Sequence, residues 1–292
     1  MSPRLRVVAA AVLFSTGGAA IKLCGFGPWQ LAAGRAVVAA FAMVVLIPEA
    51  RRGWSWRAPV VGLAYAGAGL LFIFANKMTT AASAIFIQAT NPLFILALAP
   101  LLVREHVTRR DLEYMAVLAV GMALLLSAPG RSFATAPHPV LGNILAAGCA
   151  LSWAFTVIGY RWVAHRGPAG HGAVAAAAIT GNAIVFLMAL PLALPLERGT
   201  PGDWLVVAYL GVFQLALAYV FLSRAVTQVR ALEVALLMLV EPVLSPIWAW
   251  LVHGETPGIR AVLGGVVILF GTAVHAWREP PRVPVPAPAL EG

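Results

Sequence analysis

The chain has 292 residues, of which 61% are hydrophobic and only 11% are charged, and its formal net charge is +9. A soluble globular protein carries about a quarter charged residues, so too few charges remain here to cover a water-facing surface. The basic residues are scattered through short loops, which favours a membrane protein and argues against a nucleic-acid partner.

Ten apolar segments follow one another, each of about 20 residues, the length that a helix needs to cross a bilayer. In chain order the expected spans are 5–24, 29–48, 58–76, 80–103, 111–128, 140–162, 172–195, 204–223, 231–252 and 258–277. Glycine and proline lie in the turns between them. Five prolines after residue 279 predict a disordered cytoplasmic tail at 279–292. We therefore expect an all-α integral membrane protein with ten transmembrane helices.

Lysine and arginine are divided unevenly between the loops on the two sides of the membrane. With both termini placed in the cytoplasm, fourteen lie on that side: Arg4, Arg6, Arg51, Arg52, Arg57, Arg104, Arg109, Arg110, Arg161, Arg166, Arg224, Arg230, Arg278 and Arg282. The opposite side has four: Lys77, Arg131, Arg198 and Arg260. This asymmetry predicts a multi-pass membrane protein with both termini cytoplasmic, and it supports ten spans because losing one would scramble the alternation.

An internal repeat relates the two halves of the chain. A shift of 150 positions places Pro92 on Pro242, Glu105 on Glu255, Arg110 on Arg260 and Gly121 on Gly271. The copies are residues 5–128 and 140–277, with five spans each. An odd number of spans turns the second copy upside down in the membrane, and inverted repeats are typical of secondary transporters that alternate access to a central site.

The motifs of the chain resemble those of the EamA branch of the drug/metabolite transporter superfamily, over about residues 5–278. They are Leu13-Phe-Ser-Thr16 leading to Lys22, Gly34-Arg-Ala36, Asn91-Pro92 with Arg104-Glu105, and Glu241-Pro242 with Gly254-Glu255. The resemblance implies the ten-helix fold, cytoplasmic termini and export of small organic solutes. The branch we favour is that of the bacterial exporters of amino acids, including aromatic ones, which implies the bacterial inner membrane as the location. The two halves differ in one respect, since Asn91 stands where the second half has Glu241.

Two spans are interrupted by a proline that follows a polar residue, at Asn91-Pro92 and Glu241-Pro242. Proline removes a backbone hydrogen bond and frees a carbonyl in the preceding turn, which must be satisfied by protein or cavity water within a membrane. Paired interruptions in two repeats indicate a binding site, and we expect Pro92 and Pro242 to act as hinges. The alternative is that both prolines only kink the helices for packing.

Three charged residues fall inside the predicted spans. Glu241 is expected to bind a cationic ammonium group or a coupling proton, or to form a buried pair with Lys22 or Arg35. Lys22 either snorkels to the outer surface or binds a substrate carboxylate. Arg35 lies deeper, and we expect it to serve as a structural charge in an ion pair or helix cap rather than to contact substrate.

Aromatic and amide side chains complete the predicted substrate site. Rings would stack on an aromatic or cationic solute, and amides would donate hydrogen bonds to a zwitterion, although helix packing and interhelical hydrogen bonding are the alternatives. The candidates are Phe14, Phe72, Trp153, Tyr219, Trp248, Asn76, Gln88, Asn91, Asn182 and Gln214.

The sequence thus predicts a secondary transporter that exports small organic metabolites, above all amino acids, by alternating access. Efflux of cationic drugs is the alternative within that class, and a channel or an intramembrane enzyme is a distant alternative outside it. No catalytic residue, metal site or cofactor is expected. Proton coupling and plain facilitated exchange both stay open, as does the oligomeric state.

Overall fold

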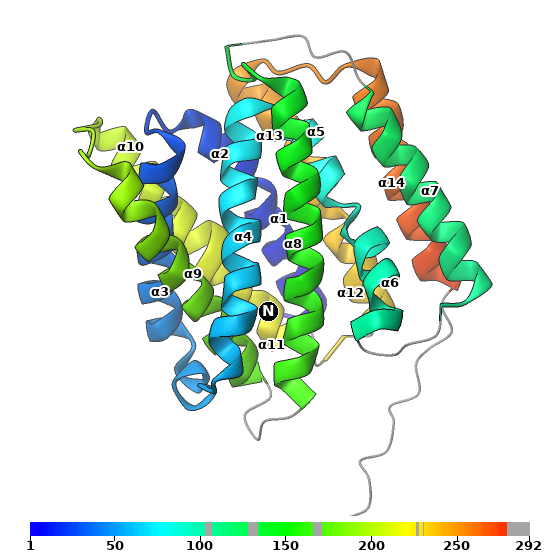
Figure 1. The fold of residues 1–292 in the computed structure, drawn as a ribbon, viewed down its shortest axis with the longest axis horizontal. Coiled ribbons are helices and arrows are strands. Elements are labelled where there is room, and N and C mark those ends of the chain that lie inside the picture. The colour runs from blue at the N-terminus through cyan, green and yellow to red at the C-terminus, as the bar shows by residue number, and fades with distance from the viewer. Residues whose placement is uncertain (103–106, 128–133, 166–170, 226–227, 230, 279–292) are drawn as a thin grey trace, which may run out of the picture.

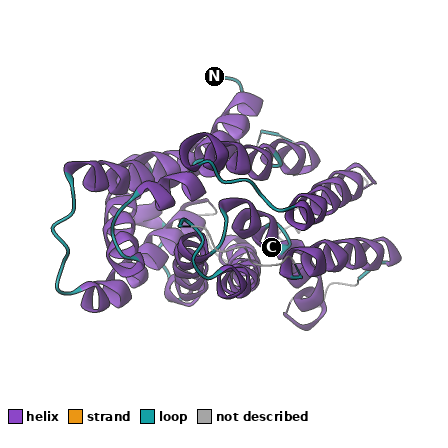
Figure 2. Ribbon diagram, turned by 90° about the horizontal axis from the view of Figure 1, so that it is seen from above, coloured by secondary structure: helices purple, strands orange, loops and turns teal. Residues whose placement is uncertain are grey.

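The computed structural model describes residues 1–102, 107–127, 134–165, 171–225, 228–229 and 231–278. In these ranges every regular element is a helix, and many helices are seen end-on from above (Figure 2). The predicted tail at 279–292 and the Arg104-Glu105 motif lie outside the described residues.

Each half of the chain contains five spans, whose arrangement in space is shown in Figure 1. The first half contains α1 (Pro3–Ser15) with α2 (Gly17–Leu23), α3 (Pro28–Leu46), the short turn η1 (Pro48–Arg52), α4 (Arg57–Met78), α5 (Ala81–Gln88) with α6 (Asn91–Leu102), and α7 (Arg109–Leu126). The second half contains α8 (Pro139–His165), α9 (His171–Ala193), α10 (Pro201–Tyr209) with η2 (Leu210–Leu217) and α11 (Ala218–Ala225), α12 (Ala231–Met238) with α13 (Val240–His253), and α14 (Ile259–Arg278).

Nine spans in the described part of the chain are long and apolar enough to cross a membrane. The remaining helix of the expected ten is α7, which has 18 residues and begins with Arg109, Arg110, Asp111 and Glu113. A capping box formed by Thr108 and Asp111 starts this helix. These charges lie at the N-terminal end of α7, which we expect at the cytoplasmic surface. The remaining turns of α7 are apolar.

The helix contacts follow the pattern that two inverted repeats produce. The third span packs on the sixth (α4 on α8), and the eighth packs on the first (η2 and α11 on α1). A two-fold exchange of the halves converts one pair into the other. The same exchange maps the second and seventh spans (α3 and α9) onto each other, and likewise α7 and α14, which lie side by side at one edge of the molecule (Figure 1). The inverted-repeat prediction is therefore confirmed.

Glycine allows the two five-helix halves to approach closely between α7 and α14. A Cβ atom added at Gly121 would lie 2.5 Å from Cγ1 of Ile268, and one at Gly271 would lie 2.5 Å from Cγ1 of Val117. The two glycines occupy the same place in the two repeats. Small residues at such contacts are the usual means of packing helices within a membrane, where lipid supplies little hydrophobic driving force.

Both predicted interruptions are present. The fourth span is broken at residues 89–90, between α5 and α6, and the ninth is broken at Leu239, between α12 and α13. Two further irregularities were not predicted. The first span breaks at Thr16, whose hydroxyl donates to the Leu13 carbonyl at 2.7 Å and competes with the helical hydrogen bonds. The eighth span contains the π-helical segment η2, a rare form often found at functional sites.

Candidate functional site

Arg35 lies in the interior of the bundle, on α3, with only 6% of its surface exposed. Its Nη2 donates to Oε1 of Gln214 at 2.9 Å, and its buried Nε has no hydrogen-bond partner. Gln214 belongs to η2, so the π-helical segment presents the acceptor for this guanidinium. The expected ion pair is not found, because no carboxylate of the described residues lies within ion-pair distance of Arg35. A buried cation therefore stands without a neutralising anion.

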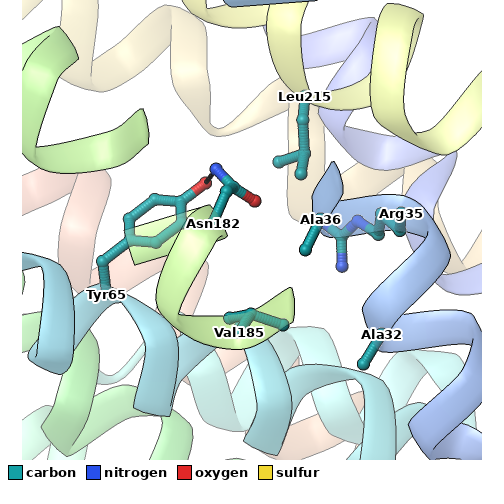
Figure 3. Close-up of a pocket in the computed structure, with 8 residues that line it drawn as sticks. Ala32, Arg35, Ala36, Tyr65, Asn182, Val185 and Leu215 are labelled. Carbon is teal, nitrogen blue, oxygen red and sulfur yellow. Dashed lines mark hydrogen bonds between the residues drawn. The ribbon is translucent and has the colours of Figure 1, made fainter. Parts of the chain in front are cut away.

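A small cavity adjoins the Arg35 side chain. It is lined by residues of α3, α4, α9 and η2. The volume open to the centre of a water molecule is about 20 Å³. On the opposite wall Nδ2 of Asn182 donates to the Tyr65 hydroxyl at 3.2 Å (Figure 3). The same Nδ2 also donates to the Ala178 carbonyl at 3.0 Å. The cavity is thus polar and has space for about one water molecule. We call Arg35, Gln214, Asn182 and Tyr65 the central polar cluster.

Aromatic rings border the central polar cluster on one side. The ring of Tyr65 lies 6.3 Å from that of Tyr219 and 6.2 Å from that of Trp153, measured between centroids. Phe14 packs edge-on against Tyr219 at 5.7 Å. Three of the predicted aromatic residues therefore come together beside Arg35 and Gln214, from helices α1, α8 and α11.

Lys22 lies apart from this cluster, in a buried ion pair. Its Nζ is 2.8 Å from Oε1 of Glu255, and the side chains are only 1% and 4% exposed. The same Nζ donates to the carbonyls of Thr79, at 2.7 Å, and Thr135. The snorkelling alternative was therefore wrong, and so was the pairing of Lys22 with Glu241. All three N–H groups of Lys22 are engaged by the protein, which leaves none for a substrate in this conformation.

Glu255 also accepts a hydrogen bond from the backbone N–H of Ala81 at 3.0 Å. The ion pair therefore ties α2 and the start of α5, in the first half, to the end of α13 in the second. Gly254, in the left-handed conformation with φ of 65°, ends α13 and turns the chain so that Glu255 can reach inward. This joint lies at the end of the bundle that the charge distribution assigns to the outer side.

Glu241 lies near the middle of the ninth span, on the interior face of α13. Ser245 and Trp248, four and seven residues further on, share that face. Ser245 is 2% exposed, and the Trp248 indole donates to Oγ of Ser15 on α1 at 2.9 Å. The Glu241 side chain is partly exposed and, among the described residues, has no hydrogen bond or ion pair.

The other predicted polar residues lie near the break in the fourth span and at the end of α4. Nδ2 of Asn91 donates to the Gln88 carbonyl at 3.2 Å, while Oε1 of Gln88 is buried without a partner. Nδ2 of Asn76 donates to the Phe72 carbonyl at 2.9 Å, and its Oδ1 is likewise unpaired. These side chains bond within their own segments and do not join the central polar cluster.

Two important residues escaped the sequence-based selection of site candidates. Tyr65 is an ordinary aromatic residue of a predicted span, and nothing in its local sequence indicates its contacts. Glu255 matched Glu105 in the internal repeat, and that match could have identified it as a partner for Lys22. Only the helix packing shows that Lys22 and Glu255 meet.

Comparison with known proteins agrees with the fold. A family model described as the EamA-like transporter family matches residues 4–127 and 140–277. A solved crystal structure superposes with a TM-score of 0.64 and 23% identity, covering 94% of this chain and 98% of that chain. At this identity the likeness shows the fold alone.

Curated relatives in bacteria and archaea carry the name uncharacterized transporter. The protein of Clostridium kluyveri is 23% identical over 69% of this chain, and that of Methanothermobacter thermautotrophicus is 23% identical over 72%. The matches span 65% and 61% of those relatives. YdfC of Bacillus subtilis is 27% identical over 72% of this chain and 67% of its own length.

Proposed function

The chain belongs to the EamA-like transporter family, and from this premise we propose that it is a membrane transporter of small molecules that exports amino acids, aromatic ones among them. In this proposal it is a secondary carrier of the bacterial inner membrane, with both termini in the cytoplasm, and it works by alternating access. The observation that carries the proposal is the buried Arg35 guanidinium, which lacks a neutralising carboxylate among the described residues.

A substrate carboxylate would supply the anion that Arg35 lacks. A guanidinium binds a carboxylate through two parallel hydrogen bonds, and its unpartnered Nε is available for one of them. Asn182 and Gln214 stand beside it with amide groups that would bind the polar end of a zwitterion. The neighbouring rings of Tyr219, Trp153 and Phe14 offer an apolar surface on which an aromatic side chain would pack.

The described conformation is closed around the central polar cluster. A cavity of about 20 Å³ has no room for an amino acid, and the Lys22–Glu255 pair holds the two halves together at the end we assign to the outer side. Substrate access therefore requires helices to move apart. The broken fourth and ninth spans supply places for that movement, so we keep Pro92 and Pro242 as the proposed hinges.

Efflux of cationic drugs is the second candidate, and Glu241 is the observation in its favour. This carboxylate has no cationic partner among the described residues and lies on the interior face of α13. Against a cationic substrate stands Arg35, whose buried positive charge would repel a second cation near the same cluster.

Counterflow in proteoliposomes tests the proposal. Vesicles loaded with unlabelled tryptophan should transiently accumulate labelled tryptophan, and Arg35→Gln should reduce the rate about tenfold or more, as the loss of an ionic contact implies. Arg260→Gln is the matched control, because Arg260 is exposed and its one hydrogen bond with the described residues goes to the Ser127 carbonyl. Wild-type rates for Arg35→Gln would refute the assigned role of Arg35. Accumulation of quaternary ammonium dyes alone would replace amino acids with cationic drugs.

A further inference from the structure

Asn91 and Glu241 occupy the same place in the two repeats, immediately before the proline that breaks the helix. Pro92 has no N–H, so the Gln88 carbonyl loses its helical hydrogen bond, and Nδ2 of Asn91 donates to that carbonyl instead at 3.2 Å. Pro242 likewise has no N–H, so the Met238 carbonyl also loses its helical hydrogen bond. An amide always carries N–H donors, whereas a carboxyl group has a donor only when it is protonated.

The position of Glu241 suits a group that exchanges protons with water. Val243, Ile247 and Trp250 on the other side of α13 are exposed, so they form the face turned to lipid. Glu241 shares the interior face with Ser245 and remains partly exposed. Water that enters the bundle when the carrier opens would therefore reach this carboxyl group. Lipid would not reach it, because lipid contacts the other face of α13.

The charges around Glu241 do not neutralise it. Helices α1, α2, α5 and α14 pack against α12 or α13. Their charged or titratable groups, with those of α12 and α13 themselves, lie towards the helix ends: Arg4, Arg6, Lys22, Glu233, His253, Arg260, His275 and Arg278. Arg4 is paired with Glu233 at 2.5 Å and Lys22 with Glu255 at 2.8 Å, while α5 has no such group. Glu241 is thus the titratable group in the middle of this span.

We infer that Glu241 binds the proton that couples transport, and that its protonated carboxyl group donates to the Met238 carbonyl as Asn91 donates to Gln88 in the first repeat. The inference rests on the proposed function as an alternating-access carrier. The carboxylate takes a proton from water on the outer side, forming an O–H bond, and returns it to water on the cytoplasmic side as substrate leaves the cell.

The proton changes the hydrogen bonding at the break. In the protonated state a bond from side chain to backbone spans the gap between α12 and α13. In the ionised state that bond is lost, and the Met238 carbonyl and the carboxylate both need water. The two protonation states therefore favour different geometries of the ninth span. The fourth span, with the permanent amide of Asn91, keeps one geometry at every pH.

Glu241→Gln separates coupling from transport, because glutamine carries a permanent N–H donor and cannot ionise. In proteoliposomes the variant should lose the pH dependence of tryptophan counterflow. It should also lose the accumulation of tryptophan that an imposed pH gradient drives. Glu233→Gln is the matched control, since the same substitution in the same span removes only the pair with Arg4. Gradient-driven accumulation by Glu241→Gln at the wild-type level would overturn the inference.

Infrared difference spectroscopy gives a readout that does not need a substrate. A step in pH on the reconstituted wild-type protein should change the carbonyl band of a protonated carboxyl group, and this signal should vanish in Glu241→Gln and persist in Glu233→Gln. An unchanged signal in Glu241→Gln would refute proton binding at this residue. Absence of wild-type counterflow would instead refute the proposed function, so the two failures are distinguishable.

Discussion

Removal of one partner of the Lys22–Glu255 pair should destabilise the protein strongly. Lys22→Met leaves a carboxylate that is 4% exposed and is held only by the Ala81 N–H at 3.0 Å. Breaking a buried pair in this way costs about 3–5 kcal/mol, because the remaining charge is neither hydrated nor neutralised. Methionine has nearly the volume of lysine without its charge, so the loss reports on electrostatics more than on packing.

The double variant Lys22→Met/Glu255→Gln tests the reasoning behind that magnitude. It removes both charges and keeps an acceptor for the Ala81 N–H, so its free energy of unfolding should lie within about 2 kcal/mol of wild type. Because each single substitution should cost about 3–5 kcal/mol, the two should be non-additive by at least about 4 kcal/mol in a double-mutant cycle.

Reversible unfolding in mixed micelles, titrated with a denaturing detergent, measures these free energies. Lys77→Met is the control, because Lys77 also contacts a backbone carbonyl, that of Cys24, but forms no ion pair with the described residues; it should lose only about 1 kcal/mol. If Lys22→Met lost no more than Lys77→Met, or if the double variant lost the sum of the single effects, the buried-charge argument would be refuted.

Two further variants test the packing and the hinges. Gly121→Ala places a Cβ atom 2.5 Å from Ile268 and should lower the free energy of unfolding by about 1–3 kcal/mol in the same titration. Gly69→Ala, whose Cβ would meet Val185 at 3.9 Å, should be neutral or stabilising. If Gly121→Ala and Gly69→Ala lowered the free energy of unfolding equally, the close-packing argument would be contradicted. Pro92→Ala with Pro242→Ala restores two helical hydrogen bonds and should slow counterflow about tenfold by stiffening the hinges. A normal rate would leave the prolines with a role in packing only.

Much of the fold follows from local chemistry that the sequence displays directly. The length of each apolar segment predicts a membrane-crossing helix, and Pro92 and Pro242 predict breaks because an imide nitrogen cannot donate. The inverted symmetry followed from rare residues kept in one register, and Gly121 and Gly271 indeed lie at matching contacts between α7 and α14. The break at Thr16 was not predicted, because threonine is tolerated in most helices: the hydroxyls of Thr156 and Thr180 also bond to backbone carbonyls, and α8 and α9 continue through them.

The pairing of side chains was decided by the tertiary structure alone. In a membrane helix the lipid-facing and bundle-facing sides are both apolar, so the sequence does not reveal how each helix is rotated. For this reason one alternative paired Lys22 with Glu241, whereas Lys22 meets Glu255. Arg35 was expected in an ion pair or a helix cap but bonds to Gln214, 179 residues away. The sequence determined which charged residues enter the membrane, and helix packing determined which of them are neutralised and which, like Arg35 and Glu241, have no ionic partner among the described residues.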